Sequence, residues 1–154
     1  MIYYYSRSGM TKTFAEAVSV VTGHNAYAFE TELEKKRGFS FVTKALGLVI
    51  SNKSFPVSNM PNTVPGEIYL CTPIWGGKMA APAKFFLENA DLQRTTVHLV
   101  LTASTPVEKY RTRALNFLEK IQCNPGNAHI FATSSKIPPE KDVLIEQLKD
   151  LLHI

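Results

Sequence analysis

Short apolar runs alternate with longer segments of helical character along the whole chain. The apolar and alternating runs predict five strands, at residues 2–6, 25–31, 67–72, 95–103 and 128–134. Between and after them the sequence predicts helices, at residues 11–21, 39–50, 79–90, 107–121 and 138–154. Apolar residues recur three or four positions apart in the first, fourth and fifth of these helices. The chain therefore has the element order of an α/β protein.

This order indicates a doubly wound parallel sheet with helices on both faces. Several of the predicted strands are apolar throughout, as expected for strands that are buried on both sides. The sequence holds no internal repeat, no low-complexity tract and no linker, so we expect a single domain over residues 1–154. At this length one domain can bury a continuous core.

Composition and charge exclude several classes of protein. Hydrophobic residues make up 45% of the chain and charged residues 19%, which is typical of a globular protein. The net charge of +4 is scattered, and the densest basic cluster, residues 35–37, follows three glutamates. We therefore expect no nucleic-acid partner. No apolar run reaches the roughly 20 residues of a membrane span, so we expect no membrane partner.

The N-terminus and the cysteines favour a cytoplasmic location. The start MIYYYSRSG lacks the basic segment and the long apolar stretch of a secretion signal. Cys71 and Cys123 are too few for a disulfide framework. Cys71, at the end of a buried strand, is expected to be a packed thiol, and Cys123 is expected in the loop at a helix end, without a CxxC partner. The four histidines, His24, His98, His129 and His153, have no ligand spacing, so no metal site is expected.

Three polar loops follow the first, third and fourth predicted strands. They read SRSGMT (6–11), TPIWGGK (72–78) and TASTP (102–106). Ligands of open parallel sheets bind outside the carboxyl ends of the strands, where the strand order reverses. We therefore expect these loops to form the functional site.

The first loop has the chemistry of an anion cradle. Ser6, Ser8 and Thr11 offer hydroxyl donors, Gly9 permits a tight turn, and the next helix directs free N–H groups at the loop. The alternative is an ordinary Ser/Thr helix cap. The chain has neither GxxxxGK[ST] nor GxGxxG, which argues against a nucleotide triphosphatase and a dinucleotide-binding motif.

The second loop places a tryptophan beside two glycines. Trp75 offers a flat surface, and Gly76 and Gly77 allow the backbone to approach a planar ring closely. The alternative is a tryptophan that packs on the core.

Together the two loops resemble those of the flavodoxin-like family. Its first loop, roughly (Ser/Thr)-x-(Ser/Thr)-Gly-x-Thr, wraps the phosphate of FMN and is matched by SRSGMT, with methionine where asparagine or histidine is commoner. Its Thr-Pro-(Ile/Val)-Trp loop flanks the isoalloxazine ring and is matched by TPIW. The resemblance extends over essentially the whole chain. It implies a five-stranded, three-layer sandwich of strand order 2-1-3-4-5, with FMN between the first and third strands.

The resemblance also implies a set of FMN-binding residues. They are Ser6, Arg7, Ser8, Gly9, Met10, Thr11, Thr72, Pro73, Ile74, Trp75, Gly76, Gly77, Lys78, Thr102, Ala103 and Ser104. Arg7 is expected to point to solvent or to screen the phosphate. A glycine peptide of the family bonds the reduced ring, a role that we assign to Gly76 or, as the alternative, to Gly77. Lys78 would raise the reduction potential if it turned toward the ring.

The third loop departs from the family pattern. It has no glycine, and its nearest aromatic, Tyr110, is expected one turn inside the next helix. Thr102, Ala103 and Ser104 can still contact the pyrimidine edge of the ring. A second stacking residue is therefore missing, and the open ring face would suit a substrate or a nicotinamide.

The expected function is that of an FMN-binding redox protein without catalytic side chains of its own. One possibility is a one-electron carrier between partner proteins, and the other is an NAD(P)H-dependent reductase of quinones or similar acceptors. Electron-carrying flavodoxins are usually strongly acidic, whereas this chain has a pI of about 9.1. A flavin-free interaction or signalling domain on the same fold is the alternative. Receiver domains of that type carry acidic residues at the strand ends, whereas SRSGMT and TPIWGG contain neither Asp nor Glu.

Overall fold

The computed structural model of the chain describes residues 1–133 and 139–152. The strands are β1 (Ile2–Tyr4), β2 (Ala26–Ala28), β3 (Glu67–Trp75), β4 (Lys78–Met79), β5 (Thr96–Ala103) and β6 (Asn124–Ala132). The helices are α1 (Met10–Thr22), α2 (Gly38–Ser51), α3 (Ala81–Asn89), α4 (Glu108–Lys120) and α5 (Lys141–Leu152), with a 3-10 turn, η1, at Glu32–Lys35. Residue 134, at the end of the last predicted strand, lies outside the described residues. So do residues 138, 153 and 154, at the two ends of the last predicted helix.

The sheet confirms the predicted architecture. Its strand order is β2-β1-β3-β5-β6, and all of these strands are parallel. The two-residue β4 pairs antiparallel with the end of β3 and lies off this path. When β4 is left out and the other five strands are numbered in chain order, their order in the sheet is the predicted 2-1-3-4-5. A single domain over residues 1–154 stays a prediction.

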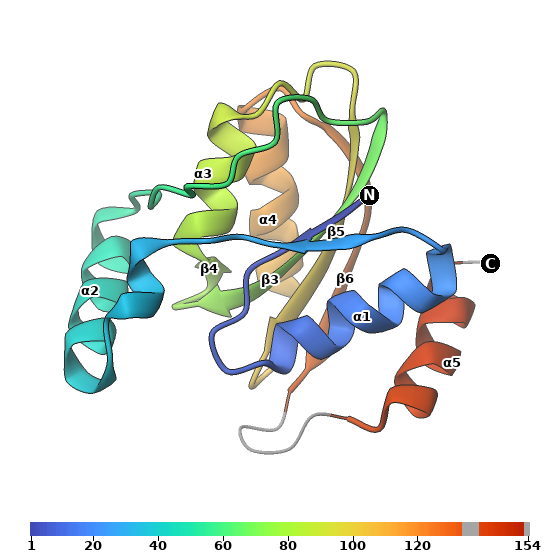
Figure 1. Cartoon of the computed structure of the whole chain (residues 1–154), viewed down its shortest axis with the longest axis horizontal. Coiled ribbons are helices and arrows are strands. Elements are labelled where there is room, and N and C mark those ends of the chain that lie inside the picture. Colours follow the sequence, from blue (N-terminus) through green and yellow to red (C-terminus); the bar gives the residue numbers. More distant parts are fainter. Residues whose placement is uncertain (134–138, 153–154) are drawn as a thin grey trace.

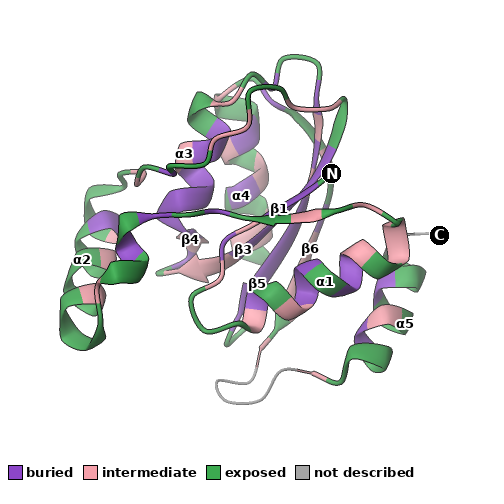
Figure 2. Ribbon diagram, viewed as in Figure 1, coloured by how far each residue is buried: buried purple, intermediate pink, exposed green. Residues whose placement is uncertain are grey.

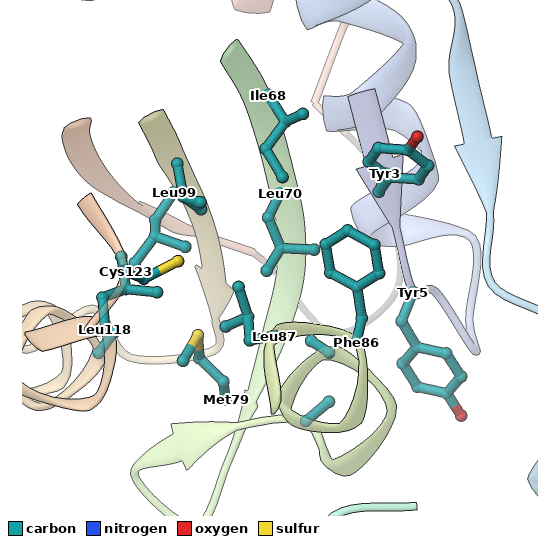
Figure 3. Close-up of a cluster of buried hydrophobic side chains, with 14 of the residues drawn as sticks. Tyr3, Tyr5, Ile68, Leu70, Met79, Phe86, Leu87, Leu99, Leu118 and Cys123 are labelled. Carbon is teal, nitrogen blue, oxygen red and sulfur yellow. The ribbon is translucent and has the colours of Figure 1, made fainter. Parts of the chain in front are cut away.

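The core has two large clusters on opposite faces of the sheet (Figure 1; Figure 3 shows the first of them) and a smaller third cluster around Leu33, Leu48 and Ala81. One cluster joins Tyr3 and Tyr5 of the first strand and its loop to Phe86 of α3 and Leu118 of α4. The other joins α1 and α5 to the opposite side of the same strands. Successive residues of a strand point to opposite faces, so Tyr3 and Tyr5 pack on one face and Tyr4 on the other.

Strand β3 continues past its predicted end. The sequence placed that end at Thr72, before a turn, but the strand runs to Trp75 and folds back as a hairpin with β4. Pro73 is tolerated because β1 pairs with β3 only as far as Cys71, and the missing N–H of a proline then interrupts no ladder there. The turn itself is Gly76-Gly77, later than predicted.

Strand β6 begins earlier than the sequence indicated. Pro125 and Gly126 were expected to form a turn before residue 128, but both lie within the strand. Among the described strands β6 is at the edge and pairs with β5 alone, and its register shifts between Val97 and Leu99. An edge position and a bulge are the places where a sheet accepts a proline. The ring of His98 fills the space that a Gly126 side chain would need.

Helix α2 lies at the margin of the molecule and is mostly exposed (Figures 1 and 2). Its inner side packs Leu48 and Phe41 near Trp75 and Leu33. Its outer side is also apolar, with Phe39 81% exposed and three further apolar residues more than half exposed, Val42, Leu46 and Ile50. None of the described helices is long and apolar enough to cross a membrane.

Candidate functional site

The three polar loops meet at the carboxyl edge of the sheet. β1, β3 and β5 are neighbours, so the ends that carry the loops lie side by side. A buried hydrogen bond of 2.8 Å joins Thr11 Oγ1, on the first loop and helix, to Thr102 Oγ1 at the end of β5. The site is therefore held together by a contact between residues 91 positions apart.

This hydroxyl pair leaves one proton for a ligand. A hydroxyl has one O–H donor, and in a pair one hydroxyl donates while the other accepts. The accepting hydroxyl, of Thr11 or of Thr102, keeps its own O–H free. Two buried threonines thus supply one donor at the carboxyl edge.

The first loop has the features of an anion cradle. Gly9 precedes α1 with a φ of 86°, in the left-handed region that favours glycine. Within the described residues no side chain caps α1, and its first turn carries no acidic residue. The Oγ atom of Ser6 is buried and has no hydrogen-bond partner among residues 1–133 and 139–152. Buried hydroxyls almost always have a partner, so Ser6 has a donor to spare for a ligand at this loop.

Tyr5 Oη is a second buried polar atom beside the loop, again without a hydrogen bond to any residue that the structure describes. Burial, with a smaller effect from Glu34, raises the pKa of Tyr5 to about 12. The phenol therefore stays protonated and keeps an O–H to donate. Its ring packs edge-on against Trp75, with the ring centroids 5.5 Å apart.

Arg7 turns toward η1 and α2. Its guanidinium donates to the carbonyl oxygen of Lys36 at 2.8 Å and lies 3.6 Å from the centre of the Phe41 ring. A longer bond reaches Leu33 O. These contacts tie the first loop to the segment before α2, so the charge of Arg7 is already engaged.

The second loop is a tight β-hairpin. Gly76 and Gly77 both have positive φ, 54° and 80°, as a two-residue hairpin turn of type I′ requires. A side chain on Gly76 would clash with Val49 of α2. One on Gly77 would meet Arg113 and, at 3.0 Å, the ring of Tyr110. The turn is therefore enclosed by two helices, and glycine is needed at both positions.

Trp75 sits at the base of this hairpin. Its indole is half-buried and packs edge-on against Phe41 of α2 as well as against Tyr5, with centroids 5.6 and 5.5 Å apart. The part of the indole that stays exposed is available to a flat ligand. The sequence did not indicate that Phe41 would belong to this cluster, because the pairing depends on how α2 docks.

Lys78 is held away from the hairpin turn. Its Nζ donates to Val49 O near the end of α2, at 3.2 Å. A cation is stabilised at this end of a helix, where the last carbonyl groups lack partners. Lys78 would have to leave Val49 O to reach a ring beside Gly76.

The third loop contributes a buried base and an exposed rim. Thr102 and Ala103 are buried at the end of β5, whereas Ser104 is exposed. Tyr110 lies in the first turn of α4, where the sequence placed it, but its ring lies beside Gly77. Arg113 also reaches the hairpin and donates to Gly77 O at 3.4 Å. The sequence missed this contact because Arg113 and Gly77 meet only when α4 packs.

Both cysteines are buried and free. Burial raises the pKa of Cys71 and of Cys123, so both thiols stay protonated. A buried neutral thiol is a poor nucleophile. Cys71 is therefore packed, as expected, and Cys123 lies between the end of α4 and the start of β6, which is the helix-end loop that the sequence indicated.

Similar proteins are found among solved structures, whereas no family model and no curated protein sequence matches the chain. A proposed flavoprotein from Bacteroides eggerthii has a TM-score of 0.71 at 14% identity, over 98% of this chain and 96% of its own. A flavoprotein from Lactobacillus acidophilus in complex with FMN has a TM-score of 0.62 at 22% identity, over 84% and 90%. Oxidised flavodoxin 2 from Bacillus cereus has a TM-score of 0.54 at 16% identity, over 99% and 97%. The chain therefore has a flavodoxin-like fold.

Proposed function

From the flavodoxin-like fold of the chain, we propose that it binds FMN non-covalently at the carboxyl edge of the sheet and acts as a redox protein. The observation that carries the proposal is the first loop. It combines an uncapped helix N-terminus with a buried Ser6 hydroxyl that has no partner within the described residues. A phosphate group would satisfy both. When bound, FMN supplies the electron transfer, and the chain binds and orients it.

The phosphate would be held by the first loop. Ser6 and Ser8 donate hydroxyl protons, Gly9 and Met10 bring the backbone N–H groups of the α1 terminus close, and the Thr11–Thr102 pair adds its one free O–H. Arg7 contributes by holding the loop to the segment before α2. Hydrogen bonds to a charged phosphate are about twice as strong as neutral ones, so the phosphate would dominate affinity.

The flavin ring would lie beside the hairpin. Thr72, Pro73 and Ile74 lead into it, Trp75 offers its exposed side to one ring face, and Gly76 or Gly77 presents its peptide to the ring. Ala103 and Ser104 border the pyrimidine edge. Lys78 is bound to Val49 O and would act on the ring through its charge rather than by contact.

Comparison of FMN with riboflavin tests the proposal. FMN fluorescence should be quenched stoichiometrically by the apoprotein, and FMN should bind far more tightly than riboflavin, which lacks the phosphate. Ser8→Ala should weaken FMN binding about tenfold or more and leave riboflavin binding unchanged. Arg7→Ala should have the smaller effect, because its guanidinium bonds elsewhere. Equal affinity for FMN and riboflavin would contradict the phosphate role of the loop.

Trp75→Ala provides the complementary test for the ring. It should cost about 1–3 kcal/mol of binding free energy, equally for FMN and riboflavin, by analogy with base–aromatic stacking. If Trp75→Ala weakened the binding of FMN but not that of riboflavin, this would contradict the position of Trp75 beside the ring.

The electron donor is a second question, and two observations bear on it. The basic charge of the chain favours an NAD(P)H-dependent reductase over an acidic electron carrier. The ring of Tyr110 beside Gly77 offers an aromatic for the second ring face and favours a one-electron carrier. Anaerobic addition of NADH, NADPH or dithionite to the FMN-loaded protein separates them. Bleaching of the visible spectrum by NADH or NADPH alone identifies a reductase, and bleaching by dithionite alone identifies a carrier.

A further inference from the structure

A groove of about 330 Å³ runs between the hairpin strand β4, helix α3 and helix α4, and Lys78, the last residue of the second loop, lines it. Four cationic side chains line it, Lys78, Lys84, Arg113 and Lys120, and no carboxylate of the described residues does. The amide side chains of Asn52 and Asn116 also line it, and Phe117 is among the apolar residues that form its floor. Its volume lies within the range of small-molecule sites. The three elements can be followed in Figure 1.

The positive charge of the groove is not neutralised by carboxylates. Within residues 1–133 and 139–152, the ion pairs of 4.0 Å or less all involve other cations. Glu88 acts on Lys84 from a greater distance. Like charges held together without counter-ions cost free energy, which a bound anion would recover.

Lys84 shows that the groove is a built feature. The residue is only 5% exposed, and its ammonium donates to Asn52 O and Oδ1 at 2.8 and 3.0 Å. It also lies 5.5 Å from the centre of the Phe117 ring. Burial lowers the pKa of Lys84; Glu88 opposes this shift, and repulsion from Lys78 and Lys120 adds to it. Lys78 and Lys120 therefore both act on Lys84.

The cations keep donors free for a ligand. An ammonium has three N–H donors, of which Lys84 uses two and Lys78 one, on carbonyl and amide oxygens at the end of α2. Arg113 uses one of its five N–H groups, on Gly77 O. Lys120 is exposed and makes no ion pair within the described residues. Most of the donors in the groove are therefore unused.

The placement of the cations favours an anion with more than one charged group. Arg113 and Lys120 lie on one face of α4, seven residues apart, which corresponds to about 10 Å along the helix axis between their backbones. A diphosphate offers one charged group to each of these two side chains, which a single phosphate does not. Arg113 offers a planar fork for one phosphate, and Phe117 offers an apolar surface for the body.

We propose that this groove binds the diphosphate group of a small molecule, at a site separate from the first loop, where we place the phosphate of FMN. The proposal does not rest on FMN binding, because none of the four cations is needed to hold the phosphate of FMN. Arg113 and Lys120 would clamp the two phosphates, and Lys78 and Lys84 would supply charge from the opposite wall. Because Arg113 also bonds Gly77 O, the ligand would lie next to the hairpin turn.

The test titrates ADP, AMP, adenosine and inorganic pyrophosphate into the full chain by calorimetry, with and without saturating FMN. ADP should bind with a Kd below about 1 mM, more tightly than AMP, and adenosine should not bind measurably. The affinity should fall as salt rises, because the contacts are ionic. ADP binding that exceeds pyrophosphate binding would assign a role to the apolar floor, and equal binding would restrict the site to the diphosphate itself. Failure of both diphosphates to bind would overturn the proposal.

Variants locate the site. The double variant Arg113→Gln/Lys120→Gln should raise the Kd of ADP about tenfold or more, since each removes a charge-assisted contact. Both residues are exposed on α4 and glutamine is a good helix former, so the fold should persist. Lys141→Gln/Lys149→Gln, an equal loss of two charges at exposed positions of α5 across the sheet, is the matched control and should leave ADP binding unchanged. Ser8→Ala should also leave it unchanged. ADP binding that is lost in Ser8→Ala and kept in the groove variant would place the anion at the first loop instead and overturn the proposal. An unaltered FMN affinity in the groove variant would separate the two sites.

Discussion

At the scale of single residues, the site is defined by polar atoms that the core surrounds but does not fully satisfy. Thr11 and Thr102 satisfy each other, whereas Ser6 Oγ and Tyr5 Oη are buried without a partner in the described part of the chain. A buried polar atom without a partner costs free energy, and a ligand that supplies one recovers it. These residues lie in or beside the first loop, which is where we place the phosphate.

The threonine pair permits a test by a double-mutant cycle. Thr11→Val and Thr102→Val keep the shape of the side chain and each leave one buried hydroxyl unpaired, so each should lower the free energy of unfolding by about 1–3 kcal/mol. The double variant removes both hydroxyls and should lose less than the sum of the two. Urea unfolding without ligand measures all four proteins. Simple additivity would show that the 2.8 Å contact contributes nothing to stability.

At the scale of elements, the β3–β4 hairpin and helix α2 form one unit. The turn Gly76-Gly77 is enclosed by Val49 on one side and by Tyr110 and Arg113 on the other. Lys78 and Lys84 bond the last carbonyl groups of α2 and so fix the helix end to the hairpin and to α3. A change in α2 should therefore be felt at the hairpin.

Gly76→Ala tests this coupling. An alanine at a φ of 54° is strained, and its Cβ would lie 2.5 Å from Val49 Cγ1. We expect a loss of about 2 kcal/mol in the free energy of unfolding. Adding Val49→Ala removes the clashing methyl groups but not the strain, so the Gly76→Ala change should cost less in that background than in the native chain.

Gly47→Ala is the matched control for this series. Gly47 lies inside α2 with ordinary φ and open space around its Cα, so alanine there should stabilise the protein by about 0.5–1 kcal/mol. Urea unfolding measures the whole series. An equal cost of Gly76→Ala in the native chain and in the Val49→Ala background would contradict the contact between α2 and the turn.

At the scale of the whole molecule, two cores enclose a sheet whose aromatic and thiol groups are shielded from water. Burial raises the pKa of Tyr5 to about 12 and also raises the pKa of Cys71, both of which are fully buried. A raised pKa in an acid means that the folded protein binds the proton more tightly than the unfolded chain. The stability from Tyr5 is therefore complete below pH 10, the ordinary value, and is lost as the pH rises through about 12.

Tyr5→Phe isolates this alkaline effect. At neutral pH the variant should be as stable as the native protein or slightly more stable, because Tyr5 Oη makes no hydrogen bond to the described residues. Near pH 11 the native protein should have lost about 1 kcal/mol relative to the variant. Unfolding in urea at both pH values gives this difference, in which the effects of other titrating groups cancel. A difference that does not change with pH would show that the Tyr5 phenol titrates at its ordinary pKa.

The element order and the three loops could be predicted from the sequence pattern, and the strand order from the resemblance to the flavodoxin-like family. Apolar runs and helical periodicity are local properties, and parallel strands bring their carboxyl ends to one edge wherever the chain folds this way. Gly9 indicated its turn for the same reason, since a left-handed backbone conformation is a local requirement that glycine meets. The predicted end of β3 and the predicted start of β6 were wrong. From the sequence alone a proline is taken to end a strand, but its cost in a sheet depends on whether a neighbouring strand would bond an N–H at that position.

Only the tertiary structure decided which side chains are engaged and which remain free. Arg7 and Lys78 look alike in the sequence as cations beside a ligand loop, but each bonds carbonyl groups near an end of α2. Tyr110 and Arg113 reach the hairpin, and the cations of the groove gather, because α4 packs where it does. These contacts join residues far apart in the chain, and their energies depend on burial and distance. A sequence lists the donors and charges, and packing determines which of them are left for a ligand.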